Sequence, residues 1–306
     1  MTVYSGRNER LIGPLLDRFT ERTGIEVRTR YGSTSELTAT LLEEGTNTPA
    51  HLFVSQDAAA LGALSRGGLL RKLPDELQGR IPGRFRSIHG DWVGLSGRAR
   101  VVVYNTERVR PEELPQRLED VTDERYRGRF GLAPSNASFQ AHMAMFLTVN
   151  GEPDLEELLR GLVANAPMRY PKNSPIVEAV IAGEIDWGLV NHYYLWRALQ
   201  EHPAAPAKNF FMPAGAASGF VNLAGAGLMR ESPEALELMR FLLSDEAQRY
   251  FADETYEYPL VPGIEPAVDL PPLEQLVDPR VDYRDVATAL ERALVLIQDS
   301  GLIGFD

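Results

Sequence analysis

Hydrophobic residues in the first hundred positions follow two alternating periods. Residues 9–23 repeat them at helical spacing and stop at Gly24, whereas residues 25–31 alternate hydrophobic and polar side chains as a strand does. Strands that alternate with helices in this way predict βαβ units and a mostly parallel sheet. By the same patterns we expect further strands at 2–4 and 51–55, and further helices from Ser33 to Gly45 and at 57–67.

Two long extended stretches, 92–105 and 219–228, show little helical periodicity. Between them the alternation of strands and helices starts again, and two more helices follow the second stretch. The expected elements are strands at 129–133 and 185–190, and helices at 136–149 and from Ser174, Ser232 and Ser244. We therefore expect two lobes, each a mostly parallel sheet flanked by helices, joined by two hinge strands.

The expected bounds follow from these stretches. One lobe comprises residues 1–100 and 225–275, the other comprises residues 103–222 and 276–306, and the hinge strands lie near 101–105 and 219–225. Ligands of open α/β sheets bind outside the carboxyl ends of the strands, so a cleft between the lobes is the expected binding site.

Composition excludes several kinds of partner and site. The chain has 306 residues, a formal net charge of -12 and a pI of about 5.0, which disfavours nucleic acid and anionic membranes as partners. Cysteine is absent, so disulfides, thiolate metal sites and cysteine nucleophiles are excluded. No signal peptide precedes the first strand, which fits either a cytosolic protein or an exported one that has lost its leader.

Tyr193 and Tyr194 stand side by side directly after the strand at 185–190. A simple interpretation is two half-buried aromatic residues at the boundary of an element. In a strand, neighbouring side chains point to opposite faces, but in the first turn of a helix they diverge by only about 100°. Asn191 is a good N-cap residue, and it would place both tyrosines in that first turn. The two phenol oxygens could then converge on one atom.

The chemistry of a phenol pair indicates a ferric ion. Ionising each phenol at neutral pH costs about 4 kcal/mol, because its pKa is near 10. A helix N-terminus supplies only about 0.3–1 kcal/mol of this, whereas a trivalent metal ion can supply the rest. Phenolate oxygen is a hard donor that suits ferric iron better than zinc or copper. Two phenolates leave one positive charge on the iron and open positions that a small oxyanion such as carbonate could occupy.

A series of stretches runs in fixed order along the chain, including V-Y-S-G-R-N-E, Y-G-S-T-S-E-L, P-A-H-L-F-V-S-Q, R-V-V-V-Y-N, G-R-F-G-L-A-P-S-N-A-S-F-Q, Y-P-K-N-S-P, A-G-E-I-D-W-G-L-V-N-H-Y-Y and F-L-L-S-D-E-A-Q-R-Y-F. In this order and spacing the chain resembles the ferric-iron-binding periplasmic proteins, which are the substrate-binding components of iron(III) ABC transporters. The resemblance covers essentially the whole chain and implies the two-lobe type II periplasmic-binding-protein fold.

The resemblance implies that Tyr193 and Tyr194 hold the metal. Some family members add a histidine in the first loop or a glutamate after the third strand, and the matching positions here are Asn8 and Gln56. Both are neutral amides and at most weak ligands. Other members add a tyrosine from the loop that matches residues 134–139, which has none. The resemblance therefore implies a ferric site with few protein ligands, completed by an anion and water.

The resemblance also implies an anion site. Arg7 matches a position where an arginine accompanies carbonate in the family, and Arg98 is a second candidate, although Arg100 could face the site instead. The backbone amides of residues 136–138 open a helix and form an anion pocket. The expected anion-binding residues are Arg7, Arg98, Asn136, Ala137 and Ser138, and the amides expected beside them are Asn8, Gln56, Asn173 and Asn191.

We therefore expect a monomeric receptor of the periplasm or cell surface that binds Fe3+ with carbonate or bicarbonate. It would deliver the metal to an ABC permease and its ATPase. We do not expect an enzyme, because no Ser-His-Asp order, phosphate loop or H-E-x-x-H spacing is present. Two alternatives stay open: a metal-free binding protein for a small anion such as phosphate or phosphonate, and an enzyme on the same fold that uses a tyrosine as general acid.

Overall fold

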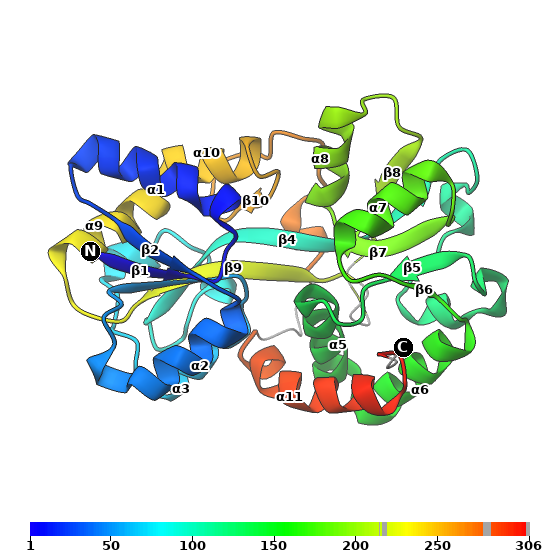
Figure 1. The fold of residues 1–306 in the computed structure, drawn as a ribbon, viewed down its shortest axis with the longest axis horizontal. Helices are drawn as coiled ribbons and strands as arrows, with labels where there is room; N and C mark the ends of the chain where they lie inside the picture. The colour runs from blue at the N-terminus through cyan, green and yellow to red at the C-terminus, as the bar shows by residue number, and fades with distance from the viewer. Residues whose placement is uncertain (214, 216–218, 278–282, 304–306) are drawn as a thin grey trace. The chain divides into compact units, whose positions relative to one another are not determined.

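The computed structural model describes residues 1–306 except 214, 216–218, 278–282 and 304–306, and it leaves out the side chains of 284, 285 and 287 (Figure 1). The chain divides into two units. Unit 1 comprises Met1–Gly97 and Leu223–Leu270, and unit 2 comprises Arg98–Asn222 and Pro271–Asp306. Parts of the expected segment 276–306 thus lie outside the described residues. The expected first lobe included residues 98–100, whereas Arg98 and Arg100 belong to unit 2.

Unit 1 is built on a mixed sheet with the strand order β2-β1-β3-β9-β4. Strand β1 lies parallel to β2 and β3, as the βα alternation predicts, while β9 is antiparallel to β3 and β10 is antiparallel to β4. The strands are β1 (Thr2–Ser5), β2 (Arg28–Tyr31), β3 (Leu52–Ser55), β4 (Trp92–Asn105), β9 (Val221–Leu228) and β10 (Tyr258–Pro259).

Helices cover both faces of this sheet: α2 and α3 lie on one side and α1, α9 and α10 on the other (Figure 1). Their starts follow the predicted caps, since the side chains of Ser33, Ser232 and Ser244 each accept a backbone N–H three residues on. The helices are α1 (Glu9–Thr23), α2 (Thr34–Glu44), α3 (Ala58–Arg66), α4 (Asp75–Gln78), α9 (Pro233–Leu242) and α10 (Asp245–Asp253).

Unit 2 contains the second part of β4, from Arg98 onward, in the strand order β4-β7-β5-β6. Strand β4 is antiparallel to β7 and to β8, and β5 is parallel to β6 and β7. Trp187 at the start of β7 stacks on Phe130 at the start of β5, with ring centroids 4.4 Å apart, and this contact packs the core between the two strands. The remaining strands are β5 (Phe130–Leu132), β6 (Met168–Arg169), β7 (Trp187–Asn191) and β8 (Ala207–Phe210).

The helices of unit 2 also lie on two sides of its sheet, with α7 and α8 on one side and α5, α6 and α11 on the other (Figure 1). They are α5 (Ala137–Asn150), α6 (Glu152–Ala164), α7 (Asn173–Ala182), α8 (Tyr193–Glu201) and α11 (Tyr283–Asp299). Among the helices that the structure describes, none is long and apolar enough to cross a membrane.

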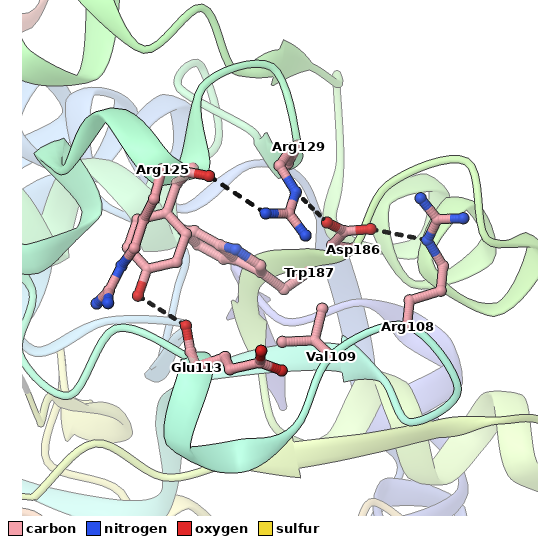
Figure 2. Close-up of a pocket in the computed structure, with 8 residues that line it drawn as sticks. Arg108, Val109, Glu113, Arg125, Arg129, Asp186 and Trp187 are labelled. Atoms are coloured by element: carbon pink, nitrogen blue, oxygen red, sulfur yellow. Dashed lines mark hydrogen bonds and ion pairs between the residues drawn. The ribbon is translucent and has the colours of Figure 1, made fainter.

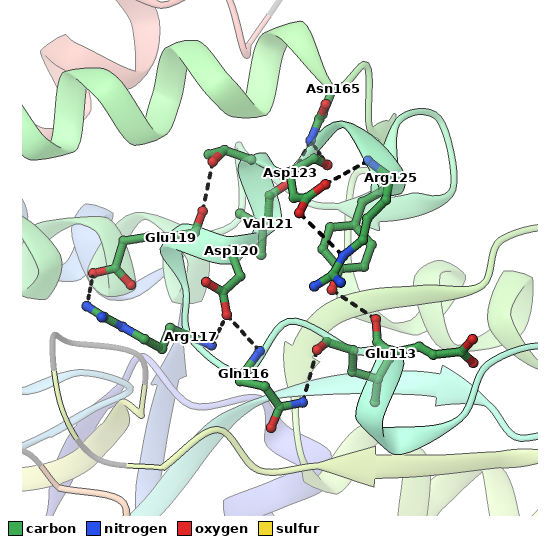
Figure 3. A network of polar contacts seen from close by, with 12 residues as sticks. Glu113, Gln116, Arg117, Glu119, Asp120, Val121, Asp123, Arg125 and Asn165 are labelled. Carbon is green, nitrogen blue, oxygen red and sulfur yellow. Dashed lines mark hydrogen bonds and ion pairs between the residues drawn. The ribbon is translucent and has the colours of Figure 1, made fainter.

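Residues 106–129 form an irregular excursion from β4 to β5 that side-chain caps hold together (Figure 3). Asn165 Nδ2 donates to the carbonyl oxygens of Val121 and Asp123 at 2.9 and 2.8 Å. Asp120 Oδ2 accepts the backbone N–H groups of Gln116 and Arg117 at 3.0 and 2.9 Å. These bonds satisfy backbone groups that have no ladder or helix partner, so a long loop keeps one conformation.

Candidate metal centre

Tyr193 and Tyr194 are the first two residues of α8, directly beyond the carboxyl end of β7. Their rings stack with centroids 4.4 Å apart and an interplanar angle of 27°. The Tyr193 phenol also acts on the Tyr194 phenol, so the two phenol groups are neighbours. Both tyrosines therefore lie in the first helical turn, as expected, with their rings side by side. Tyr193 is buried and Tyr194 half-buried, which leaves the pair accessible from the side of Tyr194.

The predicted cap of this helix is wrong in one detail. Asn191 is the last residue of β7, and its side chain bonds neighbouring side chains instead of capping α8. His192 occupies the position before the helix, with its Nδ1 accepting the backbone N–H of Ala99 at 3.1 Å. This bond fixes the histidine to β4 and gives it a structural role.

Burial raises the pKa of the Tyr194 phenol well above its ordinary value, and the neighbouring Tyr193 raises it further. The cations of Arg98 and Arg197 act in the opposite direction. Arg197 lies one helical turn beyond Tyr193, with its guanidinium carbon 5.0 Å from the centre of that ring. Without a stronger cation the Tyr194 phenol is protonated at neutral pH, so a bound cation must displace its proton.

Arg100 connects the tyrosine region to two amides. It pairs in register with Asn191 across β4 and β7. Its Nη1 donates to the side-chain oxygens of Asn173 and Asn191 at 3.0 and 3.2 Å, and its Nη2 donates to the Leu189 carbonyl at 3.0 Å. Burial lowers the pKa of Arg100 to about 10, so it stays a cation at neutral pH.

The predicted anion pocket lies at the start of α5. The Asn136 side chain caps the helix by accepting the Ser138 N–H at 3.0 Å, and the Asn136 N–H bonds the Ala133 carbonyl. Asn173 Nδ2 donates to Asn136 Oδ1 at 3.2 Å, and Asn191 Nδ2 donates to Ser138 Oγ at 3.1 Å. Of the three predicted amide donors, only the N–H of exposed Ala137 has no partner among the described residues.

Unit 2 therefore contains eight of the eleven predicted site residues, which are linked by hydrogen bonds, by sequence neighbours or by electrostatic interaction. They are Tyr193, Tyr194, Arg98, Asn136, Ala137, Ser138, Asn173 and Asn191. Arg98 and Arg100 are both buried, at 1% and 2% exposure. They are two residues apart on β4, so their side chains lie on the same face of the strand. The two arginines are therefore not the alternatives that we had expected, and both can face the site. No cluster of three His, Cys, Asp or Glu side chains suited to a metal occurs in the described chain.

The other three predicted residues belong to unit 1. Arg7 is fully buried, and its Nη2 donates to both carboxylate oxygens of Glu257 at 3.0 Å while its Nη1 donates to Ser96 Oγ at 3.0 Å. Asn8 is exposed and caps α1 by accepting the Arg10 N–H at 2.9 Å. Gln56 is half-buried and directly follows β3. In this structure the Arg7 guanidinium is thus committed to a carboxylate of its own unit.

The buried pair of Arg7 and Glu257 gives a stability prediction. We expect Glu257→Gln to lower the free energy of unfolding by about 3–5 kcal/mol, because it leaves the Arg7 cation buried without a counter-charge. The double substitution Arg7→Met/Glu257→Met removes both charges and should cost much less. Urea unfolding of the metal-free variants measures both values. Equal losses in the two variants would contradict the importance of the uncompensated charge.

A second polar pocket of about 200 Å³ lies at the opposite end of β7 (Figure 2). There buried Asp186 accepts the Nε–H groups of Arg108 and Arg129 at 2.7 and 2.5 Å. The Glu113 carboxylate also lines this pocket and pairs with Arg110. Three arginines, Arg108, Arg125 and Arg129, and two carboxylates, Glu113 and Asp186, thus line this pocket.

Residues 47–286 match a family model described as bacterial extracellular solute-binding protein. The chain belongs to this family. It is 31% identical to the major ferric iron-binding protein of Neisseria meningitidis, covering 99% of this chain and 93% of that protein. It is 32% identical to iron uptake protein A1 of Synechocystis, covering 95% of this chain and 82% of that protein.

Among solved structures, iron-bound HitA from Pseudomonas aeruginosa superimposes with a TM-score of 0.90 at 29% identity, covering 98% of this chain and 99% of that one. This solute-binding protein therefore has the expected type II periplasmic-binding-protein fold. The resemblance to ferric-iron-binding proteins is confirmed. These three relatives are named for iron binding or iron uptake, and none carries the name of an enzyme.

Proposed function

We propose that this protein is an extracytoplasmic receptor for ferric iron, with the phenolate oxygens of Tyr193 and Tyr194 as its metal ligands. The observation that carries the proposal is the side-by-side position of two phenol groups beyond the carboxyl end of β7. Two hard anionic oxygens from adjacent residues suit a trivalent iron ion. The names of the relatives, which bind ferric iron or serve iron uptake, support the same cargo.

The second part of the proposal is a synergistic anion, carbonate or bicarbonate, that completes the iron shell. Its supports in unit 2 are the Arg98 cation and the start of α5, where a helix N-terminus favours negative charge. Asn136, Ala137 and Ser138 would surround it, with the amides of Asn173 and Asn191 behind them. Roles for Arg7, Asn8 and Gln56 stay predictions from the resemblance, and Arg7 would first have to leave Glu257.

Delivery of the metal is also part of the proposal. A bacterial extracellular solute-binding protein works with an ABC permease and its ATPase, so we propose that this chain hands iron to such a transporter. The corresponding location is the periplasm or the cell surface. We propose that it does so as a monomer.

Metal loading tests the proposal. We expect purified protein mixed with ferric chloride and bicarbonate to develop a visible tyrosinate-to-iron charge-transfer band that saturates at one iron per chain. Calorimetry with phosphate and bicarbonate in the absence of iron is the companion measurement. A colourless protein that binds phosphate tightly without iron would support the metal-free anion receptor instead.

A further inference from the structure

Arg100 is a buried cation that no carboxylate compensates. It is 2% exposed, and its hydrogen bonds run to neutral groups: the side-chain oxygens of Asn173 and Asn191 and the carbonyl of Leu189. Its Nε is buried without a hydrogen-bond partner. Within the described part of the chain no carboxylate lies within ion-pair distance of it. Buried arginines normally have an anionic partner, so this one is an exception that calls for a reason.

The same chain neutralises another buried arginine completely. Arg7 in unit 1 makes a bidentate pair with Glu257, and both side chains are fully buried. Arg100 has three neutral partners in place of such a carboxylate. The phenols of Tyr194 and Tyr193 interact with Arg100 electrostatically and can carry a compensating negative charge. Anions held in the tyrosine region therefore balance the charge of Arg100.

Arg100 also orients the surroundings of that region. By accepting from Arg100 with their oxygens, Asn173 and Asn191 must direct their NH2 groups away from it. Those NH2 groups bond Asn136 Oδ1 and Ser138 Oγ, at the start of α5. One guanidinium thus fixes two amides, and the two amides fix the turn that opens the predicted anion pocket.

We infer that Arg100 is a positioning residue whose charge selects a divalent oxyanion as the partner of the metal. The inference rests on the proposed function. A ferric ion with two phenolates and one dianion carries a net single negative charge, which faces the buried Arg100 cation and the neighbouring Arg98 cation. With a monoanion the same assembly has no net charge, and Arg100 again lies buried without compensation. A buried site that ends closer to neutral is favoured, so divalent carbonate or phosphate binds better than a monoanion.

The test compares anions across matched variants. Iron affinity is measured from the charge-transfer band in competition with nitrilotriacetate, in bicarbonate, in phosphate or in formate. We expect wild type to bind iron about tenfold more tightly with bicarbonate or phosphate than with formate. Arg100→Met should abolish this difference and lower the affinity in bicarbonate roughly 100-fold. Arg100→Lys keeps the charge and should keep the preference for dianions, with weaker binding because a lysine lacks the planar fork.

Arg108→Met is the control, since Arg108 belongs to the same unit but pairs with Asp186 at the other end of β7. It should behave as wild type. A merely structural Arg100 predicts that Arg100→Met keeps the preference for dianions, whatever its heat stability, and that result overturns the inference.

If Arg100→Met does not fold, the wild-type and Arg100→Lys measurements decide. Loss of the dianion preference in Arg100→Lys, or its absence in wild type that still binds iron, also overturns the inference. Failure of wild type to bind iron under every anion contradicts the proposed function itself, which is a different outcome.

Discussion

We expect the double substitution Tyr193→Phe/Tyr194→Phe to abolish the visible band and to weaken ferric iron binding beyond detection by competition. Each substitution removes one oxygen atom that the proposal assigns as a direct ligand, while the stacked rings that pack at the start of α8 remain. Loss of a group behind the ligands typically costs about 10–100-fold in metal affinity, so loss of a ligand should cost more than roughly 100-fold.

The matched control is Tyr104→Phe, which removes one phenol oxygen from a buried tyrosine of the same unit. Tyr104 pairs with Trp187 across β4 and β7, at the end of β7 away from Asn191. This variant should keep full colour and affinity. If it lost iron as readily as the double variant, or if the double variant kept the band, the tyrosine pair could not be the metal site.

Iron affinity should fall steeply on acidification. The pKa of Tyr194 in the metal-free protein is raised by burial, so this phenol is protonated from acid up to pH values above its ordinary pKa, about 10. Iron must therefore displace this proton, and each phenolate ligand formed releases one proton, so binding strengthens as pH rises throughout this range. Two displaced protons predict about a 100-fold loss of affinity for each pH unit of acidification, before any contribution from the anion.

The dependence of iron affinity on pH gives the number of phenolate ligands. In a buffer series without bicarbonate, wild type should lose affinity about 100-fold per pH unit, and Tyr193→Phe, where binding is still measurable, about tenfold. Circular dichroism of the metal-free protein over the same pH range separates iron release from unfolding. A pH-independent affinity would show that phenolates do not hold the metal.

Hydrophobic periodicity and helix-start residues predicted the strand and the helix on which the main site residues lie. The extended stretch 92–105 is β4 in full, and both tyrosines lie in the first turn of α8. These features depend on hydrophobic periodicity and on helix starts, which neighbouring residues determine. The expectation that the two phenols lie side by side needed nothing beyond this local geometry.

Partners distant in sequence could not be predicted in the same way. Glu257 pairs with Arg7 across 250 positions, and no local pattern connects them. The capping role assigned to Asn191 was wrong for a related reason. Its side chain faces Arg100 because β4 and β7 lie side by side in a particular register, and sequence periodicity does not give registers between strands.

The position of Arg100 on its strand follows from the sequence, but the groups around it do not. We expected either Arg98 or Arg100 to face the site, although a spacing of two residues on an extended strand puts both side chains on one face. The lack of a carboxylate near Arg100 emerges only from the packed unit, where its partners are two amides and a carbonyl. The distribution of buried charge therefore depends on tertiary structure.

The most direct measurement is an anomalous difference map at the iron absorption edge, from crystals grown with ferric chloride and bicarbonate. We expect one strong peak within bonding distance of the phenolate oxygens of both Tyr193 and Tyr194. A fully occupied peak elsewhere on the chain, or well-ordered tyrosines with no iron between their oxygens, would contradict this expectation.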